Sequence, residues 1–451
     1  MNTLVPIALY GWIPFAAVLF ACMPARRAAI YGTIAGWLFL PVATLPLPGL
    51  PDYDKTYAID MGVFLGALLF DTRALTSVRV RWYDLPMLAW VLSPAISSLL
   101  NGLGPYDAGA QSVRVIIQWG LPWWIGRAYL RDLQALKELA TAIVVGGLAY
   151  APLCLWEIRM SPQLHGTVYG FHQHDFSQTV RWGGFRPTVF MHHGLMVGMW
   201  MASATLVAAV GWLACGWRRL GPLPMGGVTA VLLVTTVLCK SVGAILLLLI
   251  GVVVLLALAR ARSRALLAVL VTAPIVYLGV RASGAWSGRD LVQIAGAIST
   301  ERADSLAYRL GSEDLLAARA RQAPWFGWGG FGRSFVTRDE EGYEAVIVDS
   351  LWVLVFGQQG VFGLVALLAV LLVPVYRLTR TLPSRRWFQG GAGAAAILAV
   401  LLLLFLVDDL ANFMYHPVYM LAAGGLAGLR LPRAVPSVEP ARAPHPIEVA
   451  A

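Results

Sequence analysis

Apolar stretches recur along almost the whole chain and are separated by short polar segments. A helix needs roughly 20 apolar residues to cross a hydrocarbon core of about 30 Å, and we count about thirteen candidates. Their runs of Leu, Val and Ala lack the alternation of strands, which favours helices in an inner membrane over an outer-membrane barrel. The approximate limits are 3–22, 28–48, 57–70, 85–101, 112–129, 139–157, 191–214, 224–239, 242–259, 265–282, 348–373, 391–408 and 415–429.

This pattern predicts an all-α, polytopic integral membrane bundle of about 12–14 transmembrane helices. Two connections are much longer than the others, and their Trp, Phe, His and Gly content indicates ordered loops. The Pro- and Ala-rich end is predicted to be a disordered tail. The predicted parts are N-terminal helices 1–157, a loop 158–190, central helices 191–282, a large loop 283–347, C-terminal helices 348–430 and a tail 431–451.

Composition agrees with a membrane protein, because 58% of residues are hydrophobic and only 13% are charged. Soluble domains carry about 25% charged residues, so soluble enzymes, nucleic-acid binders and secreted disulfide scaffolds are excluded. When the loops are placed alternately on two sides, the formal net charge of +10 lies on one side. The positive-inside rule makes that side cytoplasmic and predicts that both long loops and the N-terminus face the periplasm. The basic charge is therefore a topology signal, with no nucleic-acid partner.

The first long loop and the start of the next helix contain five of the seven histidines beside Arg181 and Arg186. The cluster lacks the fixed spacing of a zinc site, so we expect no metal. Such histidines hydrogen-bond sugars, phosphates or backbone, or are simply solvated. Arg186, in GFRPT, holds a permanent charge near the membrane interface, where snorkelling is the alternative reading. The five histidines are His165, His172, His174, His192 and His193.

Lys240 stands between two apolar stretches, where the chain leaves almost no room for a hydrated loop. An ammonium there is costly unless it is snorkelled, paired or directed into a wet cavity. Two interpretations follow, namely snorkelling and a pairing with substrate or with another residue.

The second long loop predicts a surface helix over about 304–321, where leucines recur near helical spacing and Arg309 lies among them. Pro324 ends this helix, and the sequence GWGGFG follows. Glycines such as Gly327 and Gly329 allow a backbone to approach a partner closely. Asp349 directly precedes a long apolar run, which places its carboxylate to act as a base or, alternatively, as an ordinary helix N-cap.

The order of FRPTVFMHHG, KSVGAILLLL, SLAYRL, APWFGWGGFG and VDSLWVLVFGQQGVFGLV resembles that of the O-antigen ligase and O-antigen polymerase superfamily. The resemblance covers about residues 180–376. It implies a metal-independent membrane glycosyltransferase that needs no cofactor and takes a glycan from an undecaprenyl diphosphate carrier at the periplasmic face. It also implies that Arg186 and Arg309 correspond to arginines that grip the diphosphate, a role that suits guanidinium.

Two positions depart from the family pattern. Ligases of the family carry His-Asn where this chain has Asp349-Ser350, and that histidine is the candidate base. Asp349 replaces it in the predicted mechanism, with His192 or His193 as alternative bases. Many relatives carry Arg where this chain has Val242, and Lys240 then supplies the charge.

The sequence thus predicts a glycosyltransferase of exopolysaccharide or O-antigen biosynthesis, with a polymerase slightly favoured. The first alternative is an O-antigen ligase that joins the glycan to lipid A-core. A second alternative is a lipid-linked glycan transporter or flippase, which needs charged or broken helices at the bilayer midplane. Expected catalytic residues are Asp349, Arg309 and Arg186. Expected substrate-binding residues are Lys240, Arg181, His192, His193, Gly327 and Gly329.

Overall fold

The computed structural model describes residues 1–47, 49, 51–297, 299–330, 332–336, 346, 349–389 and 391–431, with residues 301 and 302 as backbone only. All of the predicted tail 431–451 except residue 431 lies outside the described residues, as does much of segment 331–348. The first half of the chain forms α1 (Leu4–Cys22), α2 (Ala25–Phe39), α3 (Lys55–Phe70), α4 (Thr72–Thr76), α5 (Leu85–Leu100), α6 (Gly104–Val115), α7 (Leu121–Tyr129), α8 (Leu133–Met160), α9 (Leu164–Tyr169) and α10 (Gly194–Ala214).

The second half is also helical. Its helices are α11 (Met225–Leu238), α12 (Val242–Leu256), α13 (Ala265–Ser283), α14 (Arg289–Gly296), α15 (Thr300–Ala320), α16 (Leu351–Thr381), α17 (Gly393–Asp409) and α18 (Pro417–Gly428). Shorter helical segments are η1 (Trp82–Asp84), η2 (Ile116–Gly120), η3 (Phe176–Thr179), η4 (Ala257–Ala261) and η5 (Ser384–Arg386). Three antiparallel two-residue ladders pair β1 (Thr44–Leu45) with β2 (Tyr53–Asp54), β3 (Val180–Arg181) with β4 (Gly184–Phe185), and β5 (Arg219–Leu220) with β6 (Leu223–Pro224).

The fold is an all-α bundle, as the apolar pattern predicts. Among the described residues, seven helices are long and apolar enough to cross a membrane. Several predicted spans form shorter helices instead: α2 has 15 residues and ends where Leu40 is extended, and α18 has 12 residues and begins only at Pro417. The seven are Leu4–Cys22, Trp82–Leu100, Leu133–Met160, Gly194–Ala214, Val242–Ala261, Ala265–Ser283 and Leu351–Thr381.

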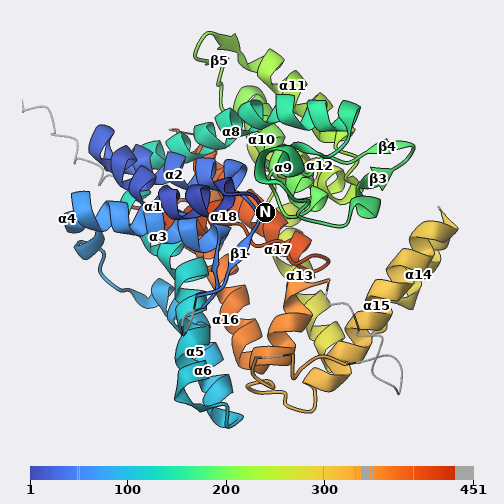
Figure 1. Cartoon of the computed structure of the whole chain (residues 1–451). Coiled ribbons are helices and arrows are strands. Elements are labelled where there is room, and N and C mark those ends of the chain that lie inside the picture. The colour runs from blue at the N-terminus through green and yellow to red at the C-terminus, as the bar shows by residue number, and fades with distance from the viewer. Residues whose placement is uncertain are drawn as a thin grey trace, which may run out of the picture.

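The centre of the bundle is formed by α10, α17 and α18 (Figure 1). These helices are apolar on every face, which is typical of a helix surrounded by others. Every residue of α18 and nearly every residue of α17 is buried. This core holds in place the loops at its ends, which carry the polar residues discussed below.

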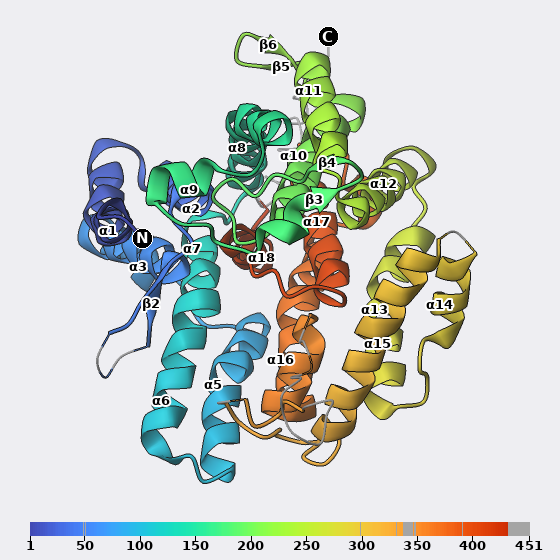
Figure 2. The ribbon, with the colours of Figure 1, turned by 45° about the vertical axis from the view of Figure 1, so that its right-hand side comes forward.

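Helices α13, α14 and α15 lie beside one another at one side of the bundle, next to α16 (Figure 2). Helix α15 is present where the leucine spacing predicts a surface helix. It carries Arg309 and packs against α14 and α16. The position of Arg309 therefore depends on how α15 is fixed to its neighbours.

Candidate functional site

A cavity of about 1200 Å³ opens between five segments that are distant in sequence. They are the loop before α10, the junction of α11 and α12, helix α15, Asp349 just before α16, and the connection between α17 and α18. Seven predicted site residues line it together: Arg181, Arg186, His192, His193, Lys240, Arg309 and Asp349. Four of them are cations and one is a carboxylate, so the lining is strongly positive.

A tight hairpin turn positions the two loop arginines. Strands β3 and β4 are joined by Trp182 and Gly183, which both have positive φ, at 47° and 64°. Such a two-residue turn matches the twist of paired strands, and glycine adopts it without strain. The backbone N–H of Arg186 then donates to the carbonyl of Thr179 at 2.7 Å.

Arg186 is buried and poorly paired. Its side chain is 8% exposed, and its Nη2 donates to the carbonyl of Lys240 at 3.2 Å. Its Nε has no partner among the described residues. Burial and the nearby cations Arg181 and Arg309 lower the pKa of Arg186 to about 10, so it is still charged at neutral pH. A buried cation with unused donors favours binding of an anion.

Lys240 fastens the hairpin to the membrane helices. It adopts a φ of 53° at the junction of α11 and α12, and its Nζ donates to the carbonyls of Arg181 at 3.0 Å and Trp182 at 3.4 Å. A Cβ at Gly184 would lie 2.3 Å from this Nζ, so a larger residue there would displace the ammonium from its present position. Lys240 thus adds charge to the cavity and orients the turn that carries Arg181.

Arg309 and Asp349 form an ion pair in the wall of the cavity. The guanidinium Nε and the Oδ2 of Asp349 are 3.5 Å apart, and both side chains are about two-fifths exposed. An ion pair with that exposure contributes only about 0–1 kcal/mol, so a ligand can separate it at little cost. The guanidinium is then free to contact an anion and the carboxylate to accept a proton.

A buried ion-pair network fixes α15, and sequence reasoning missed it. Arg281, near the end of α13, is fully buried and donates to Glu313 at 3.0 Å and Asp314 at 2.6 Å. It also donates to the carbonyl of Leu310 at 3.0 Å, directly after Arg309. The available signal was a lone arginine in the last turn of an apolar helix, opposite a helix with paired acids.

His165 is buried and His193 is half-buried, whereas His172 and His192 are exposed. His193 caps α10, because its Nδ1 accepts from the backbone N–H of Leu195 at 3.0 Å. Burial and the neighbouring His174 and Arg186 lower the pKa of His193 to about 3, and partial desolvation at the cavity wall beside His174 lowers the pKa of His192. Both imidazoles are neutral near pH 7. Within the described residues, no three His, Cys, Asp or Glu side chains are grouped to hold a metal ion.

The structure places Gly327 and Gly329 away from this cavity. Both have positive φ. The backbone N–H of Trp328, between them, donates to the carbonyl of Gly357 in α16 at 2.9 Å, and the N–H of Gly329 donates to the carbonyl of Gln358 at 3.0 Å. A Cβ at Gly327 would lie 2.4 Å from the carbonyl carbon of Gln358. These glycines lie against α16 where the non-helical Gly360 kinks it. Their close backbone partner is the protein's own helix.

A second cavity, of about 490 Å³, adjoins the first. His192 and Phe413 line both cavities. The smaller one is lined by aromatic and amide groups such as Trp37 and Gln118 and by the charged residues Asp54, Lys55 and Arg114. The indole N–H of Trp37 has no partner among the described residues. Aromatic surface with a few polar groups is typical of a small-molecule site.

Comparisons with protein-family models and with curated protein sequences find no match to this chain. Any functional argument therefore depends on the residues of these two adjoining cavities and on their charges.

Proposed function

We propose that the protein is a membrane glycosyltransferase that moves or polymerises a glycan from an undecaprenyl diphosphate carrier onto an acceptor sugar hydroxyl. The main support for this proposal is that one open cavity is lined by four cations together with the carboxylate of Asp349. The cations are Arg181, Arg186, Lys240 and Arg309. A diphosphate is an anion that four cations can bind, and guanidinium groups can each donate two hydrogen bonds to its oxygens. We further propose that this cavity faces the periplasm of a bacterium and that the bundle lies in the inner membrane.

In the proposed reaction, Asp349 accepts the proton of the acceptor hydroxyl. The hydroxyl oxygen then forms a bond to the anomeric carbon of the donor, and the bond from that carbon to the phosphate oxygen breaks. The electron pair leaves with undecaprenyl diphosphate, whose charge Arg186 and Arg309 stabilise. One displacement of this kind inverts the anomeric configuration and needs no covalent intermediate. A carboxylate used as general base contributes about 10²–10⁴-fold to such a rate.

The adjoining smaller cavity would hold the acceptor glycan. Its aromatic and amide groups suit sugar rings, the charged Asp54, Lys55 and Arg114 beside them can hydrogen-bond sugar hydroxyls, and it meets the cationic cavity at His192 and Phe413. An acceptor seated there would direct a hydroxyl into the cavity that Asp349 lines. The polymerase and ligase hypotheses differ in this acceptor, which is another repeat unit of the glycan for the first and lipid A-core for the second.

The test is the glycan profile of a deletion strain complemented with variants, resolved by size and by lipid carrier. We expect Arg186→Ala, Arg309→Ala and Asp349→Ala to abolish transfer. Arg289→Ala is the matched control, because Arg289 is an exposed cation of α14 outside the cavity lining. Membrane levels of each variant are compared by immunoblot.

The accumulated products distinguish a polymerase from a ligase. Single repeat units on the carrier identify a polymerase, whereas full-length chains stranded on it identify a ligase. Normal transfer by a well-expressed double variant of Arg186 and Arg309 would contradict the proposal. Net accumulation of lipid-linked glycan by vesicles that contain no acceptor would favour the transporter instead.

A further inference from the structure

A separate cavity of about 400 Å³ lies at the other end of α10. His193, which caps the start of α10, lines the large cavity, and Cys215, which follows its end, lines this one. The 21 residues of α10 rise roughly 30 Å, which is about the thickness of a hydrocarbon core. The two cavities therefore lie on opposite sides of the bundle. We name this one the basic pocket.

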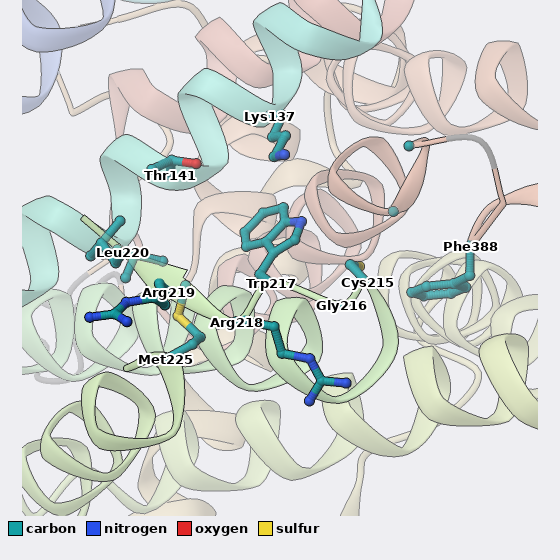
Figure 3. Close-up of a pocket in the computed structure, with 13 residues that line it drawn as sticks. Lys137, Thr141, Cys215, Gly216, Trp217, Arg218, Arg219, Leu220, Met225 and Phe388 are labelled. Atoms are coloured by element: carbon teal, nitrogen blue, oxygen red, sulfur yellow. The ribbon is translucent and has the colours of Figure 1, made fainter. Parts of the chain in front are cut away.

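Three cations surround the basic pocket. Lys137 comes from the second turn of α8, and Arg218 and Arg219 come from the segment after α10 (Figure 3). The Nζ of Lys137 lies 5.8 Å from the ring centroid of Trp217, and Arg219 donates to the carbonyl of Pro222 at 2.7 Å. The guanidinium of Arg218 has no partner among the described residues, and no described carboxylate lines the pocket. The positive charge is therefore not neutralised within the pocket.

A helix N-terminus adds to this charge. Gly393, the first residue of α17, lines the basic pocket, and no side chain caps the start of that 17-residue helix. Gly393 packs closely on the end of α10, since a Cβ there would lie 2.3 Å from the Sγ of Cys215. The first N–H groups of a helix and its dipole favour an anion at this position. Two independent features, the cations and the helix end, thus favour the same ligand charge.

Apart from Thr141 and the glycines, the remaining side chains of the wall are mainly apolar. Trp217, Leu220, Met225 and Phe388 border the pocket, and Figure 3 shows the ring of Phe388 at the side nearest Cys215. A soluble phosphate would leave this apolar surface exposed to water, whereas a lipid would cover it with glycerol and acyl carbons. We propose that the basic pocket binds the phosphate of an anionic phospholipid, on the side opposite to the large cavity. This proposal is independent of the glycosyl transfer proposed above.

The test is lipid binding by the purified full-length protein, followed by native mass spectrometry. The probes are phosphatidylglycerol, phosphatidylcholine and inorganic phosphate as a competitor. The pocket variant is K137Q/R218Q/R219Q. The control variant is R260Q/R262Q/R264Q, which removes three exposed cations that do not line the pocket.

We expect the protein and its control variant to retain phosphatidylglycerol in preference to phosphatidylcholine. Cations near a membrane surface contribute about 1 kcal/mol each to anionic lipid binding, so the pocket variant should bind it on the order of a hundredfold more weakly. Arg218→Lys keeps the charge and should retain binding, whereas Arg218→Gln should lose roughly fivefold. These single changes at an exposed residue keep the test valid if the triple variant misfolds.

Three results would overturn the proposal. The first is equal loss of phosphatidylglycerol in the pocket and control variants, and the second is equal binding of phosphatidylcholine. The third is displacement of the lipid by inorganic phosphate, because that result would assign the pocket to a soluble anion.

Discussion

The buried network around Arg281 gives a sharp prediction about stability. Arg281→Met removes a fully buried guanidinium and leaves its partner Glu313, which is 7% exposed. Among the described residues, only the hydroxyl of Tyr277 at 3.2 Å and the indole N–H of Trp352 at 3.3 Å would still donate to that carboxylate. Removing one partner of a buried ion pair costs about 3–5 kcal/mol, because the other charge is left without compensation.

The double variant Arg281→Met/Glu313→Gln should recover much of this loss. The neutral amide still occupies the position beside Tyr277 and Trp352, but no buried charge is left unpaired. We therefore expect a coupling free energy of at least about 2 kcal/mol between the two sites. The second pair, to Asp314, contributes less because that carboxylate is 44% exposed.

The assay is reversible unfolding in mixed micelles, followed by tryptophan fluorescence, for the four members of the cycle. Arg321→Met is the matched control, because this exposed arginine makes one long hydrogen bond to the carbonyl of Ala282 at 3.4 Å and should change stability by less than about 0.5 kcal/mol. Additive effects at Arg281 and Glu313, with coupling below about 0.5 kcal/mol, would refute the reasoning. So would an Arg281→Met variant as stable as the control.

Three further outcomes are expected. Asp349→Asn should lower the transfer rate by about 10²–10⁴-fold in a carrier-to-acceptor assay with little change in donor KM, and an unchanged rate would place the base elsewhere. Burial lowers the pKa of His193 to about 3, so as pH decreases the imidazole is protonated in the unfolded chain before it is protonated in the folded one, and the free energy of unfolding should fall below pH 6.5. His193→Asn, which keeps the helix cap, should reduce that fall when unfolding is measured as a function of pH. An identical pH profile for the variant would contradict this expectation. Gly327→Ala should destabilise the protein by about 1–3 kcal/mol in thermal unfolding, because the added Cβ would meet the backbone of Gln358. Gly243→Ala should not destabilise it, because no atom lies within 4 Å of a Cβ at that position. Equal melting temperatures for the two variants would refute this prediction.

Local patterns predicted the helices well where length and composition decide the structure. The apolar stretch 191–214 becomes α10, Gly194–Ala214, and the interruption at Lys240 becomes the junction of α11 and α12. The stretch 28–48 gave only α2, Ala25–Phe39, because the segment from Leu40 turns away before the helix reaches membrane length. Hydropathy alone does not record where a helix stops inside an apolar run.

The glycine-rich segment shows a different limit. Gly327 and Gly329 were predicted to bring backbone close to a substrate, and their positive φ values do accompany a close approach. The approaching backbone belongs to α16, at the kink made by Gly360. A glycine pattern specifies that something lies close to the chain, but whether that neighbour is a ligand or another helix depends on tertiary structure.

The partners of each charge separate structural groups from candidate ligand-binding groups. Arg127 is 2% exposed, and its Nε contacts Asp84 at 2.7 Å, so its charge is used within the fold. Arg281 is used in the same way by Glu313 and Asp314. Arg186 is nearly as buried, yet within the described part of the chain its guanidinium bonds to a single backbone carbonyl and its Nε has no partner. Burial of an incompletely paired cation is costly in the empty site, and an anion that enters the cavity removes that cost. The fold therefore tolerates Arg186 for a reason other than stability, and the diphosphate binding that we propose would supply one.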